Sequence, residues 1–442
     1  MGIFTETLTF PKSQFTIPKI TISLLSAVCR RKLKKDAKEL DFFPSDYFAT
    51  KKKKCTFARW MMYASLITSV PMFVCAFWSV LLLLDVITTR QVAKGRLLAY
   101  MVTVTLLYMG HYLFFTHQTG LLPVSDTIYS IANLAVFPLY FLYINELTEP
   151  SWNPRWHWLL LPAVVAGATV GILYMLMSPT ETTVFIDSYL YHNQMETLTG
   201  LAWWQAVVHH AAKAVFALQI PPIMVLGFRK ISHYNEAVEA SYADTDDRRL
   251  RLVKTILVLF VVASLLSFAA NVAGRYRFAD SLWLLFIPSA GFSALQFLLG
   301  YAGHRQSFDI HSLLNDMEAT APEYDTPSDQ PHFLHVLPTL LATTISQERL
   351  YLRPDLKITD VAHLLHTNRT YISRVLKEEM GTTFADFINR QRIEHACQLM
   401  EQSPQLSTNE VAKQSGFSAV SSFYRNFRLY KGCSPKDYPP KA

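Results

Sequence analysis

Long apolar runs separated by short polar stretches dominate the chain from residue 60 to residue 301. A helix needs about 20 predominantly apolar residues to cross the hydrocarbon core of a bilayer, and the runs are close to that length. Several tryptophans stand at or near the ends of the runs, where the aromatic side chains of membrane proteins gather. We therefore predict a bundle of about seven membrane-spanning helices over residues 60–302. The predicted spans are Trp60–Leu84, Leu97–Phe115, Ile128–Ile144, Trp158–Met177, Trp203–Phe228, Leu252–Val272 and Leu282–Tyr301.

The pattern changes after residue 302. Residues 303–331 are acidic and contain Pro322, Pro327 and Pro331, a composition typical of a flexible tether. From residue 332 onward, apolar side chains return at the three- and four-residue spacing of soluble amphipathic helices. We predict an all-α chain in which the transmembrane bundle is followed by this acidic linker and by a soluble domain over residues 332–442.

Within the soluble domain the same helical pattern occurs twice. A short helix over 356–365 and a second helix over 369–380 lead into a long helix over 384–400, and another short helix then precedes a last helix over 420–430. A buried helix that supports a second helix with an exposed N-terminal half is the layout of a helix-turn-helix. The pattern therefore predicts a double helix-turn-helix.

Local signals mark the ends of these helices. Thr359, Asn368 and Ser407 are predicted N-caps, because their side-chain oxygens can accept hydrogen bonds from the first free amides of a helix. Gly381 is predicted to end the second helix, and Gly416 to make the second turn, because glycine readily adopts positive φ.

Charge is spread unevenly over the 442 residues. Only 17% are Asp, Glu, Lys or Arg, and the formal net charge is +7. Residues 1–59 carry thirteen basic against five acidic side chains, a net of +8, and residues 333–442 carry fourteen against ten, a net of +4. A basic terminal domain suits a polyanionic partner.

The connections between the predicted spans indicate an orientation. If the first span runs from outside to inside, the inner connections hold eleven Lys and Arg and the outer connections hold two. This bias agrees with the positive-inside rule. Seven crossings then leave the C-terminal domain in the cytoplasm, so we predict a multi-pass protein of the cell (cytoplasmic) membrane.

The basic tail over residues 1–59 conflicts with that orientation, because its run Lys51–Lys54 and its cluster near Arg30 should resist export. Two interpretations remain open. The tail is a disordered extension, or the natural start lies near Met61 or Met62 and residues 1–59 are a mis-assigned start.

Catalytic and metal-binding patterns do not emerge from the sequence. The five cysteines are scattered and lack CxxC spacing, which favours neither a disulfide framework nor a zinc site. The sequence shows no Gly-rich phosphate loop, no HExxH and no GxSxG. We therefore expect no enzyme activity, no metal and no cofactor.

Three ionisable side chains, His209, His210 and Lys213, fall within the fifth predicted span. Ionisable residues inside a membrane are costly and are often functional, and His209 and Lys213 share a helix face. Two interpretations stay open: an intramembrane sensing pocket for an anionic signal ligand, and a structural hydrogen-bond cluster.

The last part of the chain resembles a known family. The stretch GFSAVSSFYRNFRLYKGCSPKDY, Gly416–Tyr438, is similar to the signature of the AraC/XylS family, and residues 350–396 are similar to the preceding part of the same domain. The signature positions are Gly416, Phe417, Ser418, Phe423, Arg425, Phe427, Gly432, Ser434, Pro435 and Tyr438. The resemblance covers about 100 residues and none of the predicted membrane bundle, so the two halves together resemble membrane-spanning regulators of this type.

The resemblance implies two recognition helices that read successive major grooves of one DNA duplex. The base contacts that it implies by position are Thr370, Ser373, Arg374, Ser421, Ser422, Tyr424 and Arg425. The phosphate contacts that it implies are Arg369, Lys377, Arg428 and Lys431. Ala419 and Val420 stand where polar residues are common in the family, so the second unit is expected to read fewer bases or to contact a thymine methyl group.

These features predict a membrane-anchored transcription regulator that couples a membrane or extracytoplasmic signal to sequence-specific promoter binding. Its expected partners are double-stranded DNA, the lipid bilayer and a signal ligand, and the sequence leaves a homodimer open. The alternative is a seven-span receptor or transporter whose C-terminal domain recruits protein partners. Neither the signal, the operator nor the direction of regulation can be read from the sequence.

Overall fold

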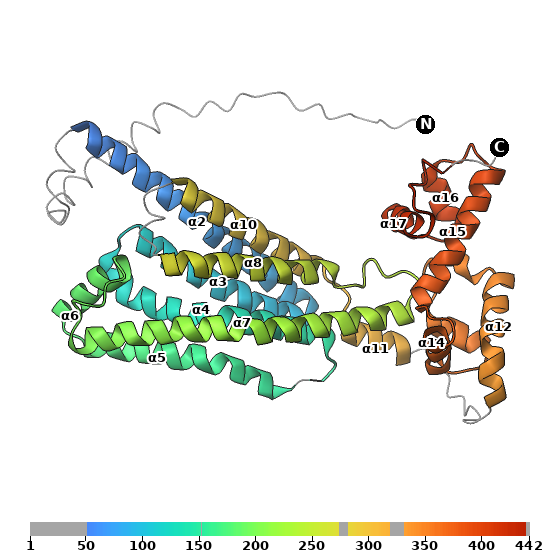
Figure 1. Cartoon of the computed structure of the whole chain (residues 1–442), viewed down its shortest axis with the longest axis horizontal. Coiled ribbons are helices and arrows are strands. Elements are labelled where there is room, and N and C mark those ends of the chain that lie inside the picture. Colours follow the sequence, from blue (N-terminus) through green and yellow to red (C-terminus); the bar gives the residue numbers. More distant parts are fainter. Residues whose placement is uncertain (1–50, 152, 274–281, 319–330, 439–442) are drawn as a thin grey trace, which may run out of the picture. The chain divides into compact units, whose positions relative to one another are not determined.

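The computed structural model describes residues 51–151, 153–273, 282–318 and 331–438 (Figure 1). They belong to two compact units, Met1–Met62 and Tyr63–Ala442, and the side-chain contacts described below lie in the second. Residues 1–50 of the predicted basic tail and residues 319–330 of the predicted linker lie outside the described residues. Strands are absent from the described ranges, where one isolated bridge pairs Tyr242 with Lys357, so the all-α prediction is confirmed.

Among the residues that the structure describes, six helical segments are long and apolar enough to cross a membrane. They are Ser65–Thr89, Val92–Phe115, Thr119–Thr148, Pro154–Leu176, Gly200–Ser241 and Leu285–Glu318. The sixth predicted span, Leu252–Val272, falls on helix α8, Arg251–Ala273. It is not among the six, and its side chains from residue 267 onward lie outside the described residues. The described part of the chain therefore supports a helical bundle of the predicted kind.

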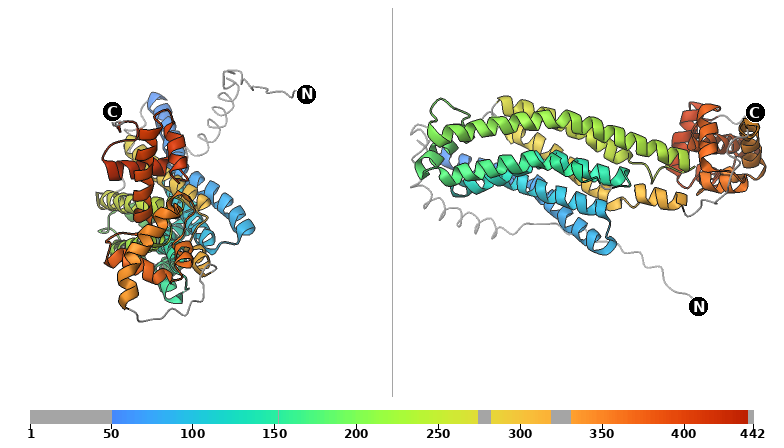
Figure 2. Two further views of the ribbon diagram at one scale, coloured as in Figure 1. Left: turned by 90° about the vertical axis from the view of Figure 1, so that its right-hand side faces the viewer. Right: turned by 90° about the horizontal axis from the view of Figure 1, so that it is seen from below.

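The long helices run side by side, as the two views of Figure 2 show. Helix α4, Leu122–Thr148, contacts α3, α5 and α7 and is the most buried of the six segments. The bounds of the other helices in the bundle are α2 Lys51–Thr89, α3 Val92–Phe115, α5 Leu161–Leu176, α7 Gly200–Ser241 and α10 Leu282–Arg305. Inside the bundle Tyr100 is fully buried, and its hydroxyl donates to Gln296 Oε1 at 3.2 Å.

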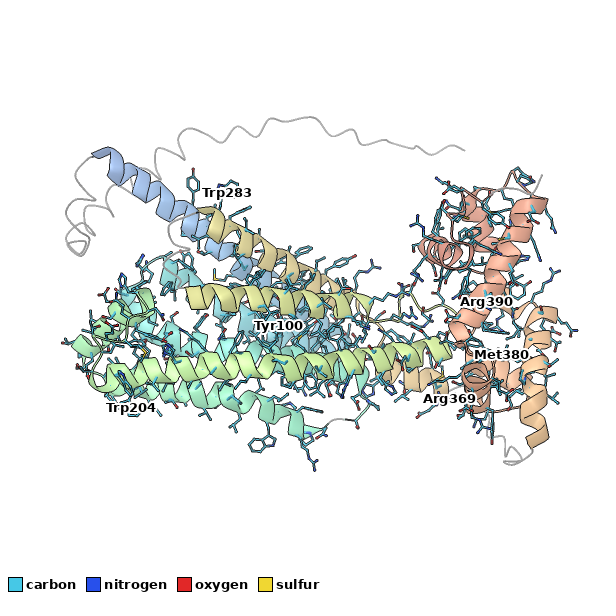
Figure 3. The ribbon with its side chains drawn as sticks, viewed as in Figure 1. Tyr100, Trp204, Trp283, Arg369, Met380 and Arg390 are labelled. Atoms are coloured by element: carbon cyan, nitrogen blue, oxygen red, sulfur yellow. The ribbon has the colours of Figure 1, made fainter. Side chains whose placement is uncertain are left out.

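The outer faces of the bundle are apolar. Phe73 is 64% exposed, Leu218 74% and Met175 87%, values that are unfavourable in water but typical of a surface that contacts lipid. Trp204 and Trp283 lie toward the same end of the bundle (Figure 3), as interfacial aromatic residues do. At this end the chain between α5 and α7 folds into the short helix α6, Pro179–Val184, and a π-helix, η4 Phe185–Tyr191.

Helix α7 is longer than a bilayer requires. Its 42 residues correspond to about 63 Å, whereas the hydrocarbon core is about 30 Å thick. The apolar part ends near Phe228, and Arg229–Ser241 continues as one helix beyond it. Pro221 and Pro222 interrupt the backbone hydrogen bonds of α7 midway, where a helix can bend.

The C-terminal domain begins with α12, Pro331–Gln347, after a short helix, α11 Ile310–Glu318, that lies in the predicted linker. The two predicted helix-turn-helix units follow and share the long helix α15, Phe384–Gln402. The first unit comprises η5 Leu350–Leu352, α13 Ile358–Leu364 and α14 Arg369–Glu378; the second comprises α16 Thr408–Gln414 and α17 Val420–Lys431.

The two units belong to different hydrophobic cores. Ile358, Ile372 and Leu376 of the first unit are part of one continuous core with Leu250 and Leu313, which flank the bundle. The second unit has a separate core. Its buried members are Ile393, Ala396, Cys397, Val411, Ala412, Phe417, Phe423 and Phe427.

Most predicted helix ends agree with the structure. Asn368 Oδ1 accepts from Thr370 N at 2.9 Å, and Ser407 and Glu410 form a capping box. The prediction for Thr359 is wrong: the side chain is 2% exposed inside α13. The helix begins two residues earlier, with Lys357 as its N-cap, because the Asp360 carboxylate accepts from the backbone amide of Lys357 at 3.0 Å and satisfies the helix start in its place.

Candidate nucleic-acid interface and polar cluster

Helix α14 presents the first predicted reading surface. Ile372, Val375 and Leu376 are buried and fix the helix on the core. Their spacing turns Thr370 and Arg374 to the exposed face and leaves Ser373 half-buried. Arg369 and Lys377, the predicted phosphate contacts, are exposed on the same helix, and Figure 3 shows Arg369 at its start. The ion-pair partner of Arg374 is Glu378 of the same helix, at 3.9 Å.

Helix α17 presents the second predicted surface. Phe423 and Phe427 are fully buried, which leaves Ser421 and Arg425 exposed and Tyr424 half-buried against Phe423. Arg428 and Lys431 are exposed toward the end of the helix.

Ser422, a predicted base contact, lies on the buried side of α17. It is 5% exposed, and its hydroxyl accepts from Arg425 Nη2 at 3.3 Å and lies 3.4 Å from Asn426 Nδ2. The buried arc of the helix is wider than its two phenylalanines suggest, because Asn426 is also inside. Ser422 is therefore placed to orient Arg425, and we no longer assign it a base contact.

A buried arginine that the sequence does not single out joins the two units. Arg392 lies in α15 and is 1% exposed. Its Nε donates to Tyr351 O at 2.7 Å and its Nη2 to Arg353 O at 2.6 Å, while its guanidinium lies over the ring of Phe417. Burial lowers the pKa of Arg392 to about 10. The side chain fastens the first unit to the start of the second through directional hydrogen bonds.

The second turn requires a glycine for two reasons. Gly416 has φ +83°, a conformation that side chains with a Cβ rarely adopt. A Cβ here would also lie 2.6 Å from Tyr351 O and 2.8 Å from Leu352 Cα. The turn can therefore approach the backbone of the first unit only because residue 416 has no side chain.

Charged side chains gather where α17 faces the connection between α7 and α8. Asp246 Oδ1 accepts from Arg425 Nη2 at 2.5 Å and lies 3.6 Å from Arg251 Nη1. Burial lowers the pKa of Arg251, and the neighbouring positive charge of Arg425 lowers it further. Burial also raises the pKa of the Asp244 carboxyl.

Inside the bundle, the predicted sensing residues meet an acidic residue that the sequence analysis missed. His209 Nε2 lies 2.8 Å from Asp126 Oδ2, and the Tyr174 hydroxyl donates to the same oxygen at 2.9 Å. Tyr189 of η4 contacts both remaining residues: its hydroxyl lies 3.1 Å from His210 Nδ1 and accepts from Lys213 Nζ at 3.4 Å. We call these six residues the polar cluster. Asp126 stands 83 residues from His209, so only the fold brings them together.

A cavity of about 180 Å³ lies elsewhere in the bundle, among Arg96, Asn145, Glu146, His157 and His311. Arg96 contacts both Glu146, at 3.7 Å, and His157, at 3.2 Å, so charges of both signs are already matched there. In the described ranges, His, Cys, Asp and Glu side chains form no group of three that could hold a metal ion.

Comparisons with known proteins concern the C-terminal region. A family model described as a helix-turn-helix domain matches residues 349–439. The HTH-type transcriptional regulator YfiF of Bacillus subtilis is 31% identical over 125 residues, which are 28% of this chain and 39% of that protein. The HTH-type transcriptional regulator SAS0078 of Staphylococcus aureus is 30% identical over 89 residues, 20% of this chain and 12% of that protein.

A response regulatory protein of Staphylococcus epidermidis is 26% identical over 152 residues, 33% of this chain and 59% of that protein. The chain thus spans less than two thirds of each of these relatives. No solved structure matches it. Residues 349–439 form an AraC-type helix-turn-helix domain, which this chain carries after a bundle of apolar helices.

Proposed function

We propose that this protein is a membrane-anchored transcription regulator that binds specific DNA sequences in response to a signal received by its helical bundle. The observation that carries the proposal is the presence, in one chain, of a helix-turn-helix domain with two exposed recognition faces and a bundle with apolar outer faces. Duplex DNA is the partner that such a domain fits.

In this proposal Arg374 and Arg425 each contact a base edge, since a guanidinium can pair bidentately with guanine. Thr370, Ser373, Ser421 and Tyr424 contribute smaller base contacts. Arg369, Lys377, Arg428 and Lys431 bind phosphates, which fixes the position of the domain on the duplex without reading its sequence. Ser422 holds Arg425 in place.

The bundle anchors the DNA-binding domain at the cytoplasmic face of the membrane. The basic side chains that follow the apolar part of α7, beginning with Arg229 and Lys230, support this orientation. The extension of α7 to Ser241 then leads directly from the bilayer toward the DNA-binding domain.

The polar cluster is the part of the bundle that we assign to signal reception. Asp126 contacts His209, and Tyr189 contacts Lys213, so the cluster holds basic side chains of the kind that suit an anionic ligand. If Lys213→Ala and His209→Ala left the response to an inducer unchanged, the cluster would be a structural hydrogen-bond network instead.

The test is sequence-selective binding by the full-length chain in lipid nanodiscs. Duplexes are selected from a random pool, and the affinity of the selected sequence is measured against salt concentration. We expect selective, salt-sensitive binding, which Arg374→Ala weakens and makes less selective at one base-pair position. Glu394→Gln, an exposed change on α15, serves as the control.

The alternative, a receptor or transporter whose end domain recruits proteins, predicts a different result. Wild-type chain would then bind all duplexes with equal, weak affinity, and Arg374→Ala would not change the selectivity. That outcome would overturn the proposed function.

A further inference from the structure

The connection between α7 and α8, residues 242–250, contacts the second recognition helix through two acidic side chains. We call these residues the acidic loop. Asp244 accepts a hydrogen bond from the hydroxyl of Ser418, which lies just before α17. Asp246 accepts from Arg425 within α17, at 2.5 Å. Both contacts fall on the segment 418–425, which includes Ser421, Tyr424 and Arg425, the residues to which the proposed function assigns base contacts.

Duplex DNA and the acidic loop cannot both occupy that segment. A bidentate contact with guanine uses two parallel N–H groups of an arginine, and Asp246 already holds Nη2 of Arg425. A carboxylate beside α17 would also lie close to the DNA backbone, where like charges repel. The acidic loop therefore occupies the place beside Arg425 where a hydrogen-bond acceptor of DNA would bind.

The acidic loop is itself fixed by the ends of α7 and α8. Tyr234 of α7 donates its hydroxyl hydrogen to Arg248 O at 3.1 Å, and Leu250 N donates to Asn235 Oδ1 at 2.9 Å. Arg248 Nη1 in turn donates to Asp244 O at 2.9 Å. These bonds make the position of Asp244 depend on where α7 ends.

The first unit is joined to the same loop in a different way. Ala243 N donates to Leu356 O at 3.0 Å, and Asn389 Nδ2 donates to Ala243 O at 3.3 Å. Lys357 Nζ lies 3.1 Å from Asp316 of α11. Since Leu356 is fully buried in the shared core, the first unit is held by packing, whereas the second is held by side chains that are partly exposed to solvent.

We propose that Asp244 and Asp246 hold the second helix-turn-helix in an autoinhibited position, and that a displacement of the end of α7 releases it to read DNA. This regulation rests on the proposed function, because it assumes that Arg425 reads bases. In the held state the first unit alone can meet a duplex, and in the released state both can.

The first experiment compares DNA affinities of full-length chains in nanodiscs, using the duplex that wild-type chain selects. We expect the double variant Asp244→Asn, Asp246→Asn to bind about 5- to 20-fold more tightly than wild type, as loss of a competing state requires. Asp247→Asn removes the same type of charge from an exposed neighbour in the acidic loop. It should stay within about 2-fold of wild type.

The second experiment follows the contact itself, without relying on affinity. Asp244→Cys and Ser418→Cys are combined in a background with Cys29→Ser, Cys55→Ser and Cys433→Ser. We expect a disulfide to form readily in the chain alone and more slowly when a saturating amount of the selected duplex is present.

The outcomes separate the two proposals. If wild type binds selectively but the double variant matches Asp247→Asn, or if saturating duplex leaves disulfide formation unchanged, autoinhibition is overturned while the proposed function stands. If no variant binds any duplex selectively, the proposed function fails, and the inference fails with it.

Discussion

The two helix-turn-helix units differ more in how they are held than in how they are built. Helix α14 stands on a core that continues toward the bundle through Leu250 and Leu313, and Arg374 faces solvent. Helix α17 stands on a core of its own, and Arg425 is bound to Asp246. Apolar packing is strong and hard to reverse, whereas partly exposed ion pairs are weak. This difference makes the first unit an anchor and the second unit the part that can be released.

The largest effect that should separate the units follows from Gly416→Ala. Strain at positive φ and the collision with Tyr351 O should together lower the stability of the second unit by about 3–4 kcal/mol. Hydrogen exchange should show lost protection over α16 and α17, with α3 and α4 unchanged.

Gly432→Ala provides the matched control for this prediction. Gly432 also has positive φ, +74°, but a Cβ there meets no atom within 4 Å. The substitution should lower the stability of the second unit only through backbone strain, by about 1 kcal/mol. Equal effects of the two substitutions would show that the close approach of Gly416 to the first unit is unimportant.

Arg392→Met should affect both units, because Arg392 joins them. The substitution removes two hydrogen bonds that a charged donor makes to the partly buried carbonyls of Tyr351 and Arg353, at a cost of about 2–3 kcal/mol. Hydrogen exchange should accelerate near residues 350–353 and again near residues 416–431. Arg390→Met, on the exposed face of the same helix, should change protection little; a comparable loss there would argue against the assigned role of Arg392.

Alanine substitutions at the two reading arginines should have unequal effects on DNA affinity. Arg374→Ala should cost about 1–3 kcal/mol. Arg425→Ala should cost up to about 1 kcal/mol less, since it also removes the competing ion pair with Asp246. Repeating both in the Asp244→Asn, Asp246→Asn background, by fluorescence anisotropy, should bring the two costs together. Costs that remain unequal by the same amount would contradict the comparison.

The smallest expected effect is that of Lys377→Ala on α14. An exposed phosphate contact should weaken binding to all duplexes by a similar amount, well under 1 kcal/mol, and reduce the slope of log affinity against log salt by about 1. Titrations at several salt concentrations, with selected and scrambled duplexes, measure this. A loss confined to the selected duplex would place Lys377 at a base edge instead.

Local features of the sequence were sufficient to predict the helices of the DNA-binding domain. Asn368 and Ser407 act on neighbouring residues, and the positive φ of Gly416 is also a local feature, so these three positions could be predicted from short-range pattern. The N-cap prediction for Thr359 was wrong for a reason that is also local: the carboxylate of the adjacent Asp360 satisfies the start of the helix instead. Likewise, the length of the apolar runs was sufficient to predict the helical bundle.

Contacts between distant residues could not be predicted in this way. The bond between Arg425 and Asp246 joins residues 179 apart, and the one between His209 and Asp126 joins residues 83 apart. Each residue alone looks like an ordinary charged position. Burial of Ser422 and Arg392 also depends on neighbours that only the folded domain supplies.

Pro221 and Pro222 divide α7 into two arms. The arm before the prolines carries His209 and Lys213. The arm after them ends at Ser241, three residues before Asp244. The arm after the prolines is about 29 Å long, so a tilt of about 10° at the prolines moves the C-terminal end of α7 by about 5 Å. That distance exceeds the length of any hydrogen bond. A tilt too small to disturb the packing around the polar cluster would thus produce a displacement at the end of α7 that is large enough to break the contacts of both Asp244 and Asp246.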